Sequence, residues 1–334
     1  MSLAQTIQNA WNKQSKWLIV LRPLSWLYQF GFNLNKYLFR WGVKKTYHAP
    51  VPVMVIGNIT VGGSGKTPLL IQLVKYLQKN QIRVGVISRG YGGQGPFPAQ
   101  VTLDSVPENV GDEPCLIVQS TDVPMVVGSN RQENIELLLK HHALDLIISD
   151  DGLQHWALAR QIEWIVLDNN RGLGNQKLLP EGYLREPVSR LENSTVIEHA
   201  YDPKSELNMH LQVAEPYLLN PYFDQSERFD STLDYYAVVG IGFPQRFYHT
   251  LESMGVEQFQ CHEFADHYDY EIDDLQFEDA NPIITTEKDA VKILPLLKKH
   301  PDFKREIWVV PVEAVLSEAC YLLLKQQLAE LGIA

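Results

Sequence analysis

The sequence predicts an α/β fold in which a mostly parallel sheet carries helices on both faces. Short apolar segments of branched residues alternate with segments of helical periodicity, and glycine-rich turns follow several of the apolar segments. The 334 residues exceed one typical domain, so we also expect a smaller α/β domain. The predicted division is an amphipathic arm at 1–45, a core at 46–200, a linker at 201–233 and the smaller domain at 234–334, with room for its last helix to pack back on the core.

The N-terminal arm is basic and rich in aromatic residues. Four of the seven tryptophans lie within residues 1–45, and no Asp or Glu precedes Asp104, although the net charge of the chain is −11. Aromatic rings and basic side chains of this kind favour the surface of an anionic membrane. Six residues share one face of the predicted helix: Leu24, Leu27, Tyr28, Gly31, Leu34 and Leu38.

We expect this arm to lie on the membrane rather than to cross it. Its longest uncharged run, 23–35, has 13 residues, whereas a spanning helix needs roughly 20. The start of the chain also lacks the basic segment of a secretory signal. An alternative is a helical arm that packs on the protein's own core or on another subunit.

The first predicted strand, 52–57, leads into the glycine-rich sequence GNITVGGSGKTP and then into a helix with apolar residues at helical spacing. Glycines let backbone N–H groups surround an anion, and the start of the helix adds positive potential. The lysine then reaches the terminal phosphates and the threonine ligates Mg²⁺. The predicted nucleotide-binding residues are Thr60, Val61, Gly62, Gly63, Ser64, Gly65, Lys66 and Thr67.

One residue departs from the common G-x-x-x-x-G-K-[ST] pattern, because Thr60 stands at the position of its first glycine. The alternative for the whole segment is a glycine-rich turn with an incidental lysine. A strand, GK[ST] and a helix in succession favour nucleotide binding over that alternative.

Alternating strands and helices continue along the core and resume after the linker. Core strands are predicted at 82–93, 123–128, 144–152 and 162–168, with a helix at 131–141. In the smaller domain, strands are predicted at 235–242, 258–267 and 282–289, with helices at 245–254 and from 290 onward. In sheets of this kind, ligands bind beyond the carboxyl ends of the strands.

Two carboxylate pairs suggest phosphoryl transfer. Asp150 and Asp151 close an apolar strand, as a Walker B carboxylate does, and Asp112 and Glu113 form a second pair in VGDEP. A kinase needs a metal site and a group that accepts a hydroxyl proton, so two clusters fit a kinase better than a nucleotide switch. The alternative for each pair alone is a turn or a helix cap.

Several single residues are weaker candidates. His267, which follows a strand of the smaller domain, has the chemistry to orient a carboxylate across an interdomain cleft, although a lone histidine is more often structural. Arg89, Arg171 and Arg185 lie on glycine-containing segments and are candidates for holding a substrate phosphate, or are ordinary surface arginines.

Other classes of protein fit less well. A guanine-nucleotide switch reads its base with an Asn or Thr, Lys, any residue, Asp string, and in TTEKD the lysine and aspartate are adjacent. A DNA-associated ATPase would use the basic arm on nucleic acid, but the density of tryptophan favours lipid. A membrane-recruited ATPase without lipid kinase activity stays an alternative. The three cysteines form no C-x-x-C pair, which indicates neither zinc nor a disulfide framework and fits reduced thiols in the cytosol.

Seven motifs then occur along the chain in one order: GNITVGGSGKTP, SRGYGG, VGDEP, SDDGLQH, DNNRGLGNQKLLPEGYLREP, FADHYDY and ITTEKDAVKI. The chain resembles the tetraacyldisaccharide 4'-kinase family, the lipid A 4'-kinases of Gram-negative bacteria, from the arm to about Leu294. The resemblance implies a P-loop NTPase-like core and transfer of phosphate from ATP, with Mg²⁺, to the 4'-hydroxyl of a tetraacyldisaccharide 1-phosphate. It also implies a peripheral or monotopic position at the cytoplasmic face of the inner membrane, with no nucleic-acid partner.

The same resemblance implies roles for individual residues. Asp112 is similar to the catalytic base, with His267 as its partner, while Lys66 and Asp151 also serve catalysis. The implied metal-shell residues are Thr67, Glu113, Asp150 and Asp151. The implied substrate-lining residues are Asn58, Tyr91, Arg131, Gln154, His155 and Arg171, to which Arg89 is added as a phosphate contact.

Overall fold

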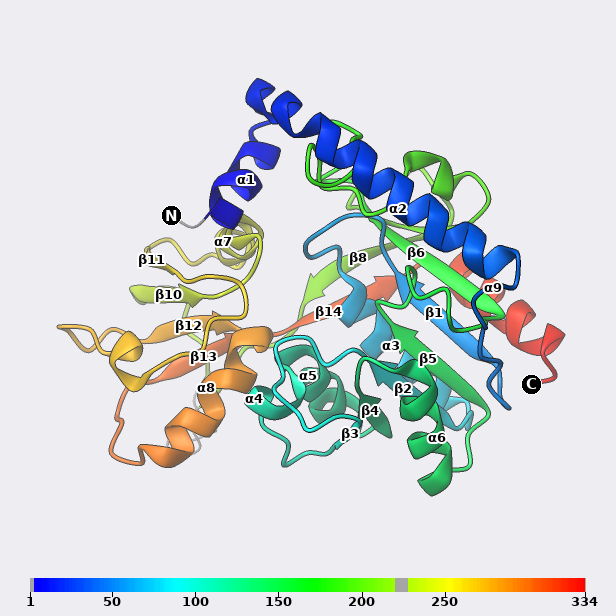
Figure 1. The fold of residues 1–334 in the computed structure, drawn as a ribbon. Helices are drawn as coiled ribbons and strands as arrows, with labels where there is room; N and C mark the ends of the chain where they lie inside the picture. The colour runs from blue at the N-terminus through cyan, green and yellow to red at the C-terminus, as the bar shows by residue number, and fades with distance from the viewer. Residues whose placement is uncertain (1–2, 220–227, 334) are drawn as a thin grey trace.

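A computed structural model describes residues 3–219 and 228–333, and these residues form two sheets (Figure 1). The first sheet contains, in spatial order, β14 (Val312–Leu316), β8 (Asn208–Val213), β7 (Thr195–His199), β6 (Ile162–Asp168), β1 (Val53–Gly57), β5 (Leu146–Asp150), β2 (Val84–Ser88), β4 (Met125–Val127) and β3 (Ala99–Val101). Only the two edge pairings of this sheet are antiparallel among the described strands. The predicted mostly parallel α/β class is therefore confirmed.

The second sheet is smaller. Its strands, in spatial order, are β11 (Phe259–Glu263), β10 (Tyr235–Val239), β12 (Ile283–Thr286), β13 (Ile307–Val310) and β9 (Tyr217–Leu218). The pairings from β11 to β13 are parallel, and β9 closes one edge in the antiparallel sense. Two helices with long apolar faces pack on this sheet, α7 (Pro244–Ser253) and α8 (Glu287–Lys299).

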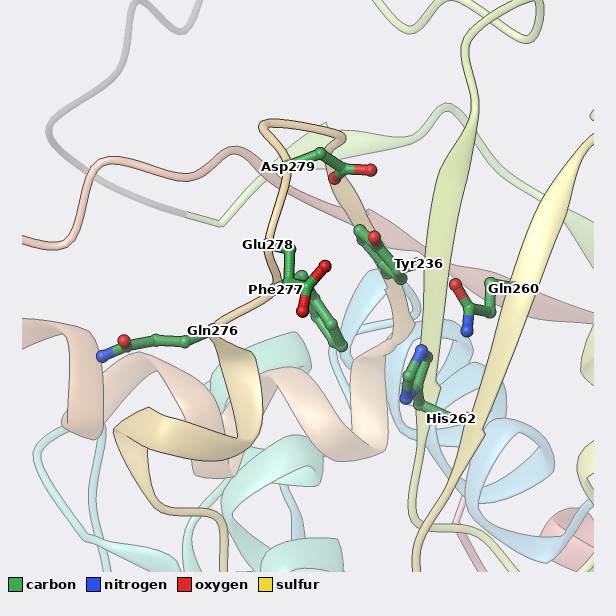
Figure 2. Close-up of a pocket in the computed structure, with 7 residues that line it drawn as sticks. All are labelled: Tyr236, Gln260, His262, Gln276, Phe277, Glu278 and Asp279. Carbon is green, nitrogen blue, oxygen red and sulfur yellow. The ribbon is translucent and has the colours of Figure 1, made fainter.

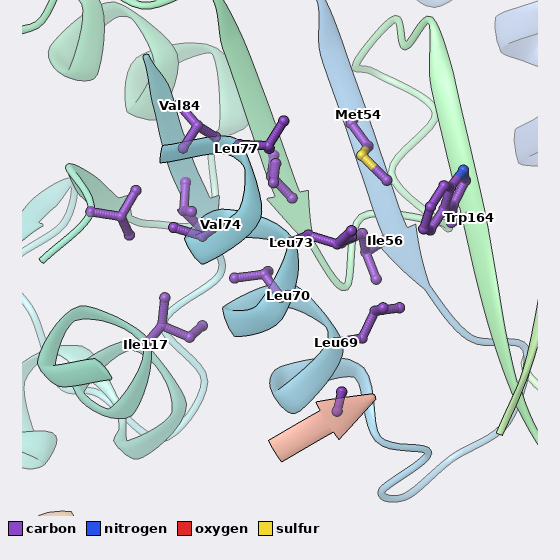
Figure 3. Packing of buried hydrophobic residues seen from close by; sticks show 14 of the residues in the cluster. Met54, Ile56, Leu69, Leu70, Leu73, Val74, Leu77, Val84, Ile117 and Trp164 are labelled. Atoms are coloured by element: carbon purple, nitrogen blue, oxygen red, sulfur yellow. The ribbon is translucent and has the colours of Figure 1, made fainter. Parts of the chain in front are cut away.

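Helices cover both faces of the first sheet. On one face lie α3 (Lys66–Lys79), α5 (Asp112–Thr121) and α9 (Glu318–Glu330), whereas α6 (Arg131–His141) covers the other. Successive residues of β1 point alternately into these two cores, which explains why the strand reads as an unbroken apolar run. Figure 3 shows the apolar face of α3, including Leu70 and Leu73, packed against the sheet. Outside the N-terminal arm, the remaining short helices are α4 (Pro107–Val110), η2 (Val188–Leu191) and η3 (Ile272–Leu275).

The expected linker at 201–233 needs correction, because two strands lie within it. β8 joins the first sheet and β9 joins the second, while 220–227 lie outside the described residues. The chain also returns to the first sheet at its end, where β14 pairs with β8 and α9 buries Leu324 and Leu328 in the first core. Antiparallel pairing with β14 covers the exposed edge of β8, a pairing that composition alone does not reveal.

One strand boundary also differs from the prediction at 282–289. β12 ends at Thr286, and the backbone turns into α8 at Glu287. The Thr286 hydroxyl accepts a hydrogen bond from the Asp289 N–H, which caps the first turn of the helix. Lys288 and Asp289 are therefore helical.

The N-terminal arm consists of α1 (Leu3–Asn12), the 3-10 helix η1 (Lys16–Leu21) and α2 (Arg22–Arg40). One side of the arm packs on residues 178–185. The Trp11 indole N–H donates to the Pro180 carbonyl at 3.0 Å, Ser25 donates to the Leu178 carbonyl at 3.0 Å, and Tyr28 donates to the Arg185 carbonyl at 2.9 Å. The arm is thus attached to the loop that follows β6.

The opposite side of the arm is exposed and apolar. Over the described residues, none of the helices combines the length and the apolar character that crossing a bilayer requires. Of the six residues predicted to share a face, Leu24, Leu27, Gly31 and Leu34 are exposed, whereas Tyr28 and Leu38 are partly covered by the protein. The exposed large apolar side chains of the arm are Trp17, Ile19, Val20, Leu24, Trp26, Leu27, Phe30, Leu34, Tyr37, Trp41 and Val43.

Candidate functional site

The glycine-rich loop joins the carboxyl end of β1 to the start of α3. Gly65, immediately before the helix, has φ +91°, and a Cβ there would lie 2.8 Å from Met209 and 2.9 Å from His199. Only glycine satisfies both the left-handed backbone and this close packing. Since Gly65 has no side chain to cap the helix, the first N–H groups of α3 are available to an anion.

A buried amide organises the loop from inside. Asn58 is fully buried, and its amide donates to the hydroxyls of Thr60 at 3.2 Å and Ser64 at 3.1 Å. Thr60, the residue that departs from the common pattern, thus supplies an acceptor that glycine lacks. These contacts are internal to the loop, and the predicted contact of Asn58 with a substrate stays a prediction.

Residues 171–185 brace the same loop from outside. The Val61 N–H donates to the Tyr183 carbonyl at 2.8 Å, the Arg185 N–H donates to the Ile59 carbonyl at 2.7 Å, and the Arg171 guanidinium donates to the Val61 carbonyl. Arg171 therefore holds the backbone of the loop, and its predicted contact with substrate phosphate is not tested by this geometry.

The Asp151 carboxylate forms ion pairs with two cationic side chains of the site. It lies one residue after β5 with φ +45°, a conformation that is uncommon for a residue with a side chain. Its carboxylate lies 3.6 Å from the Lys66 ammonium and 2.8 Å from the Arg185 guanidinium. Burial would raise the pKa of Asp151, but Lys66 and Arg185 outweigh it and lower the pKa to about 2. Asp151 is therefore ionised at neutral pH.

Asp150, in contrast, has an oxygen without a partner. Oδ2 accepts a hydrogen bond from the Ser88 hydroxyl at 3.2 Å, while Oδ1 is buried and has no hydrogen-bond partner. Burial, Glu113 and Asp151 raise the pKa of Asp150 to about 7. A buried, unsatisfied carboxylate oxygen is costly unless a cation completes its surroundings.

These residues fit Mg²⁺ held jointly with phosphates. Within 3–219 and 228–333, no cluster of three or more His, Cys, Asp or Glu side chains stands close enough to hold a metal alone. Mg²⁺ commonly uses one or two carboxylates together with phosphate oxygens and water. The unsatisfied Asp150 oxygen suits this arrangement, and Thr67 and Glu113 lie in the first turns of α3 and α5.

A second constellation joins the two sheets. Nδ1 of His267, in the loop after β11, lies 3.0 Å from each carboxylate oxygen of Asp112 at the start of α5. Burial would raise the pKa of Asp112, but the hydrogen bond with His267 and the charge of Lys288 hold it below its usual value. Burial would lower the pKa of His267, yet the bond with Asp112 raises it above 6.5. His267 has φ +62°, so this contact is made from an uncommon backbone conformation.

The two constellations are linked through the turn after β2. Ser88, whose hydroxyl donates to Asp150, is the last residue of β2, directly before that turn. A Cβ on Gly111 would lie 2.5 Å from the Tyr91 carbonyl, which belongs to the turn. The Tyr91 ring lies 5.1 Å from the His267 ring, centroid to centroid. Tyr91 and Arg89 are exposed, as residues that receive a ligand must be.

Other predicted substrate residues mainly hold the framework. Arg131 is buried and donates to the carbonyls of Gly128 at 3.1 Å and Asp150 at 3.2 Å, and burial lowers its pKa to about 10. Gln154 donates to the Asn58 carbonyl at 3.2 Å and to Glu186 at 2.8 Å. His155 lies near Arg131, and its predicted role stays a prediction.

Sequence reasoning missed one role and one residue. Arg185 was considered for substrate phosphate, and the structure brings it to Asp151 instead. Lys288, which belongs to the segment compared with a base-reading motif and to the family motif ITTEKDAVKI but was given no role, reaches the carboxylates of Asp112 and Glu113. The available signal was a lysine in the first turn of a helix, where a cation is unfavourable.

A separate hollow of about 460 Å³ lies on the second sheet (Figure 2). It is lined by Tyr236, Gln260, His262, Gln276, Phe277, Glu278 and Asp279. None of the predicted site residues lines it, so the hollow is not the candidate site. The candidate site instead follows the carboxyl ends of β1, β2 and β5, where ligands bind in parallel sheets.

Comparison with known proteins gives the same family in sequence and in structure. The family model described as tetraacyldisaccharide-1-P 4'-kinase matches residues 17–329. A tetraacyldisaccharide 4'-kinase of Psychrobacter cryohalolentis is 46% identical over 100% of this chain and 98% of its own length. One of Actinobacillus pleuropneumoniae serotype 5b is 43% identical over 97% of this chain and 99% of its own.

A solved structure is also similar. The crystal structure of LpxK from Aquifex aeolicus in complex with ATP superimposes with a TM-score of 0.75 and 27% identity. The match covers 94% of this chain and 99% of that one. The likeness therefore extends over both sheets.

Proposed function

The chain belongs to the tetraacyldisaccharide-1-P 4'-kinase family, and from this membership we propose how its residues perform the reaction. The reaction is transfer of the γ-phosphate of ATP to the 4'-hydroxyl of a tetraacyldisaccharide 1-phosphate, a precursor of lipid A. The observation that carries the residue assignments is the pairing of Asp112 with His267.

The glycine-rich loop and Lys66 receive the phosphates of ATP. Free N–H groups at the start of α3 face the phosphates, and Lys66 adds a positive charge to the terminal ones. The Asp151 carboxylate, held by Arg185, keeps Lys66 in place. Thr67, Glu113, Asp150 and Asp151 would hold Mg²⁺, which when bound neutralises the charge that develops on the transferred phosphate.

Asp112 acts as the base. Its carboxylate is ionised at neutral pH because His267 and Lys288 lower its pKa, and it accepts the proton of the 4'-hydroxyl as that oxygen attacks phosphorus. His267 orients the carboxylate and stabilises its charge. Because the two residues come from different sheets, the base is in place only when the sheets are held together, and this arrangement excludes water as a competing acceptor.

The exposed substrate residues lie where the sugar arrives. Arg89 and Tyr91 project from the turn after β2, and we assign them to the disaccharide phosphate and to the sugar ring. Arg131, Gln154, Asn58 and Arg171 hold the walls of the site through the backbone contacts described above. His155 completes the same wall.

The arm brings the enzyme to its lipid. We propose that the apolar side of α2 inserts at headgroup depth on the cytoplasmic face of the inner membrane while its basic side chains contact anionic lipid. A substrate with several acyl chains stays in the bilayer, so a peripheral or monotopic enzyme reaches it without removing it. The arm and the glycine-rich loop both contact the segment 178–185, and this shared contact supports a phosphate donor held close to the membrane surface.

The membrane-recruited ATPase is not favoured, because the family and its relatives are kinases. The test is ATP consumption by the purified full-length protein with Mg²⁺, with and without tetraacyldisaccharide 1-phosphate in detergent micelles, with label followed from the γ-phosphate into lipid. We expect lipid-dependent turnover and labelled lipid. Turnover that ignores the lipid and leaves it unlabelled would overturn the kinase assignment.

A further inference from the structure

The sequence TTEKD, Thr285–Asp289, has no role in the function described so far. Its aspartate holds the second sheet together: fully buried Asp289 accepts hydrogen bonds from the Gly240 N–H at 3.2 Å, Tyr270 at 3.0 Å and Thr286 at 2.7 Å. These contacts explain the presence of Thr286 and Asp289. They leave Lys288 unexplained, because its side chain points out of this network.

Lys288 stands where helix electrostatics disfavour it. It lies in the first turn of α8, whose N–H groups present positive partial charge, and Lys or Arg normally occupy the last turn of a helix. Its side chain is also mostly buried, at 20% exposure. A buried cation at a helix N-terminus requires compensating anions, and these come from outside the helix.

Three carboxylates surround the Lys288 ammonium. Its Nζ lies 3.2 Å from Asp266, 3.4 Å from Glu113 and 3.8 Å from Asp112. Two of these partners, Asp112 and Glu113, lie in α5, which covers the first sheet, and α8 packs beside α5 (Figure 1). Lys288 thus crosses from the second sheet to the carboxylate that His267 also contacts.

The Asp112 carboxylate is therefore held from two directions. His267 contacts both of its oxygens, and Lys288 attracts Oδ2, while the Asp112 side chain is only 4% exposed. Without the ammonium, the carboxylates of Asp112, Glu113 and Asp266 would face one another as like charges at short range, and the buried Asp112 would be the least screened by water. Their repulsion would move Asp112 away from the position in which His267 holds it.

We propose that Lys288 is a positioning residue of the kinase: it fixes the Asp112 carboxylate against His267 and ties α8 to α5. This inference rests on the proposed function, in which Asp112 accepts the hydroxyl proton. The Lys288 ammonium donates hydrogen bonds to Asp266 and Glu113, and the Asp112 carboxylate lies 3.8 Å away, so its charge is already balanced by carboxylates and we do not assign it as a phosphate contact like Lys66. Its loss should therefore lower kcat and leave the KM for ATP nearly unchanged.

The experiment compares three variants of the full-length protein. Lys288→Met removes the charge and keeps the length, Lys288→Arg keeps the charge, and Lys299→Met makes the same change at an exposed position in the last turn of α8. The measurements are kcat, the KM for ATP and the KM for tetraacyldisaccharide 1-phosphate. A long-range ¹⁵N–¹H correlation spectrum of the imidazoles, with His267 assigned through His267→Gln, reports the contact with Asp112 independently of activity.

We expect Lys288→Met to lower kcat roughly 10- to 100-fold, since a displacement of about 1 Å in a reacting group costs about that much. In Lys288→Met the KM for ATP should stay within about twofold of the wild-type value, and the His267 ring signals should shift. Lys288→Arg should recover most of the wild-type kcat and most of the wild-type ring signals. Lys299→Met should match the wild type. These results together would support the assignment.

Two outcomes would overturn it. One is a Lys288→Met enzyme with wild-type kcat and unshifted His267 signals. The other is an equal loss in the Met and Arg variants with unshifted His267 signals, which would mean that Lys288 only stabilises the fold. If Lys288→Met does not fold, Lys288→Gln takes its place with the same expectations. A wild-type protein that fails to label the lipid would instead overturn the proposed function, so the two failures are distinguishable.

Discussion

Nδ1 of His267 lies 3.0 Å from both carboxylate oxygens of Asp112, although 155 residues separate the two. Asp112 begins a helix that covers the first sheet, whereas His267 lies in a loop of the second sheet. The contact is made by a histidine with φ +62° and an aspartate that is almost fully buried. A buried carboxylate and a strained backbone are costly for stability, and such features cluster at functional sites. Among the proposed catalytic residues, Asp112 and His267 therefore have the strongest physical support for a functional role.

Replacing Asp112 by asparagine should abolish most transfer. The amide keeps the shape of the side chain but does not accept the hydroxyl proton, so we expect kcat to fall by about 10²- to 10⁴-fold. The measurement is the rate of label transfer from ATP to lipid at saturating substrates. Asp122→Asn, the same change at the C-terminal end of the same helix, should leave the rate unchanged. An Asp112→Asn enzyme with near wild-type kcat would refute the assignment of the base.

Lys66→Met should weaken catalysis through a different interaction. The variant removes the charge aimed at the terminal phosphates and leaves Asp151 paired with Arg185 alone. Loss of one such stabilising group typically costs about 10²- to 10³-fold in kcat. Lys79→Met, in the exposed last turn of the same helix, is the matched control. Equal rates for the two variants would contradict the role of Lys66.

His155 should make the stability of the fold depend on pH. Burial, together with Arg131 and Arg160, lowers its pKa from 6.5 to about 4. Between these two values the unfolded chain binds more protons than the folded one, so stability falls as the pH decreases from 6.5 towards 4. In His155→Gln this contribution is absent. The melting temperatures of both proteins are measured at pH 7.5 and at pH 5. The fall in melting temperature between these two pH values should be smaller in His155→Gln than in the wild type.

Much of the first sheet was predictable because its signals are local. The strand, glycine-rich loop and helix of Val53–Lys79 are specified by consecutive residues, and β2, β4, β5 and β6 all lie within predicted segments. The return of α9 to the first core was only an open option. The pairing of β14 with β8 was missed, because pairing across about 100 residues leaves no periodic signal in either segment.

The residues of the candidate site were likewise predictable only where their signals are local. Lys66 and Thr67 were predictable from one contiguous motif, and Asp150 and Asp151 from the end of an apolar strand. The partners of these residues were not, because Arg185 and Lys288 arrive from loops and helices whose placement depends on tertiary packing. The pairing of Asp112 with His267 came from the family resemblance rather than from any spacing in the sequence.

Substitutions on the exposed side of the arm should reduce membrane binding. Trp26 and Phe30 are 64% and 68% exposed, so the double variant Trp26→Ser/Phe30→Ser removes apolar surface without disturbing the contacts with 178–185. We expect weaker partitioning into vesicles of anionic lipid and a raised KM for lipid, with an unchanged KM for ATP. Leu322→Ser, which removes an exposed apolar side chain from α9, is the control. Unchanged partitioning in a vesicle flotation assay would show that the arm does not bind the membrane.

Ser25→Ala should loosen the connection between the arm and the nucleotide site. The Ser25 hydroxyl is buried, donates to the Leu178 carbonyl at 3.0 Å and accepts from the Glu181 N–H at 2.9 Å. Its removal leaves both backbone groups without these partners, which costs about 1–3 kcal/mol of folding free energy.

This loss of stability should also affect ATP binding, because residues 178–185 hold the glycine-rich loop through the backbone of Tyr183 and Arg185. We therefore expect a higher Kd for ATP, measured by titration calorimetry without lipid, together with a lower melting temperature. Ser189→Ala, an exposed position in η2, should change neither. A Ser25→Ala protein that melts earlier but binds ATP as tightly as the wild type would mean that the arm stabilises residues 178–185 without influencing the phosphate loop.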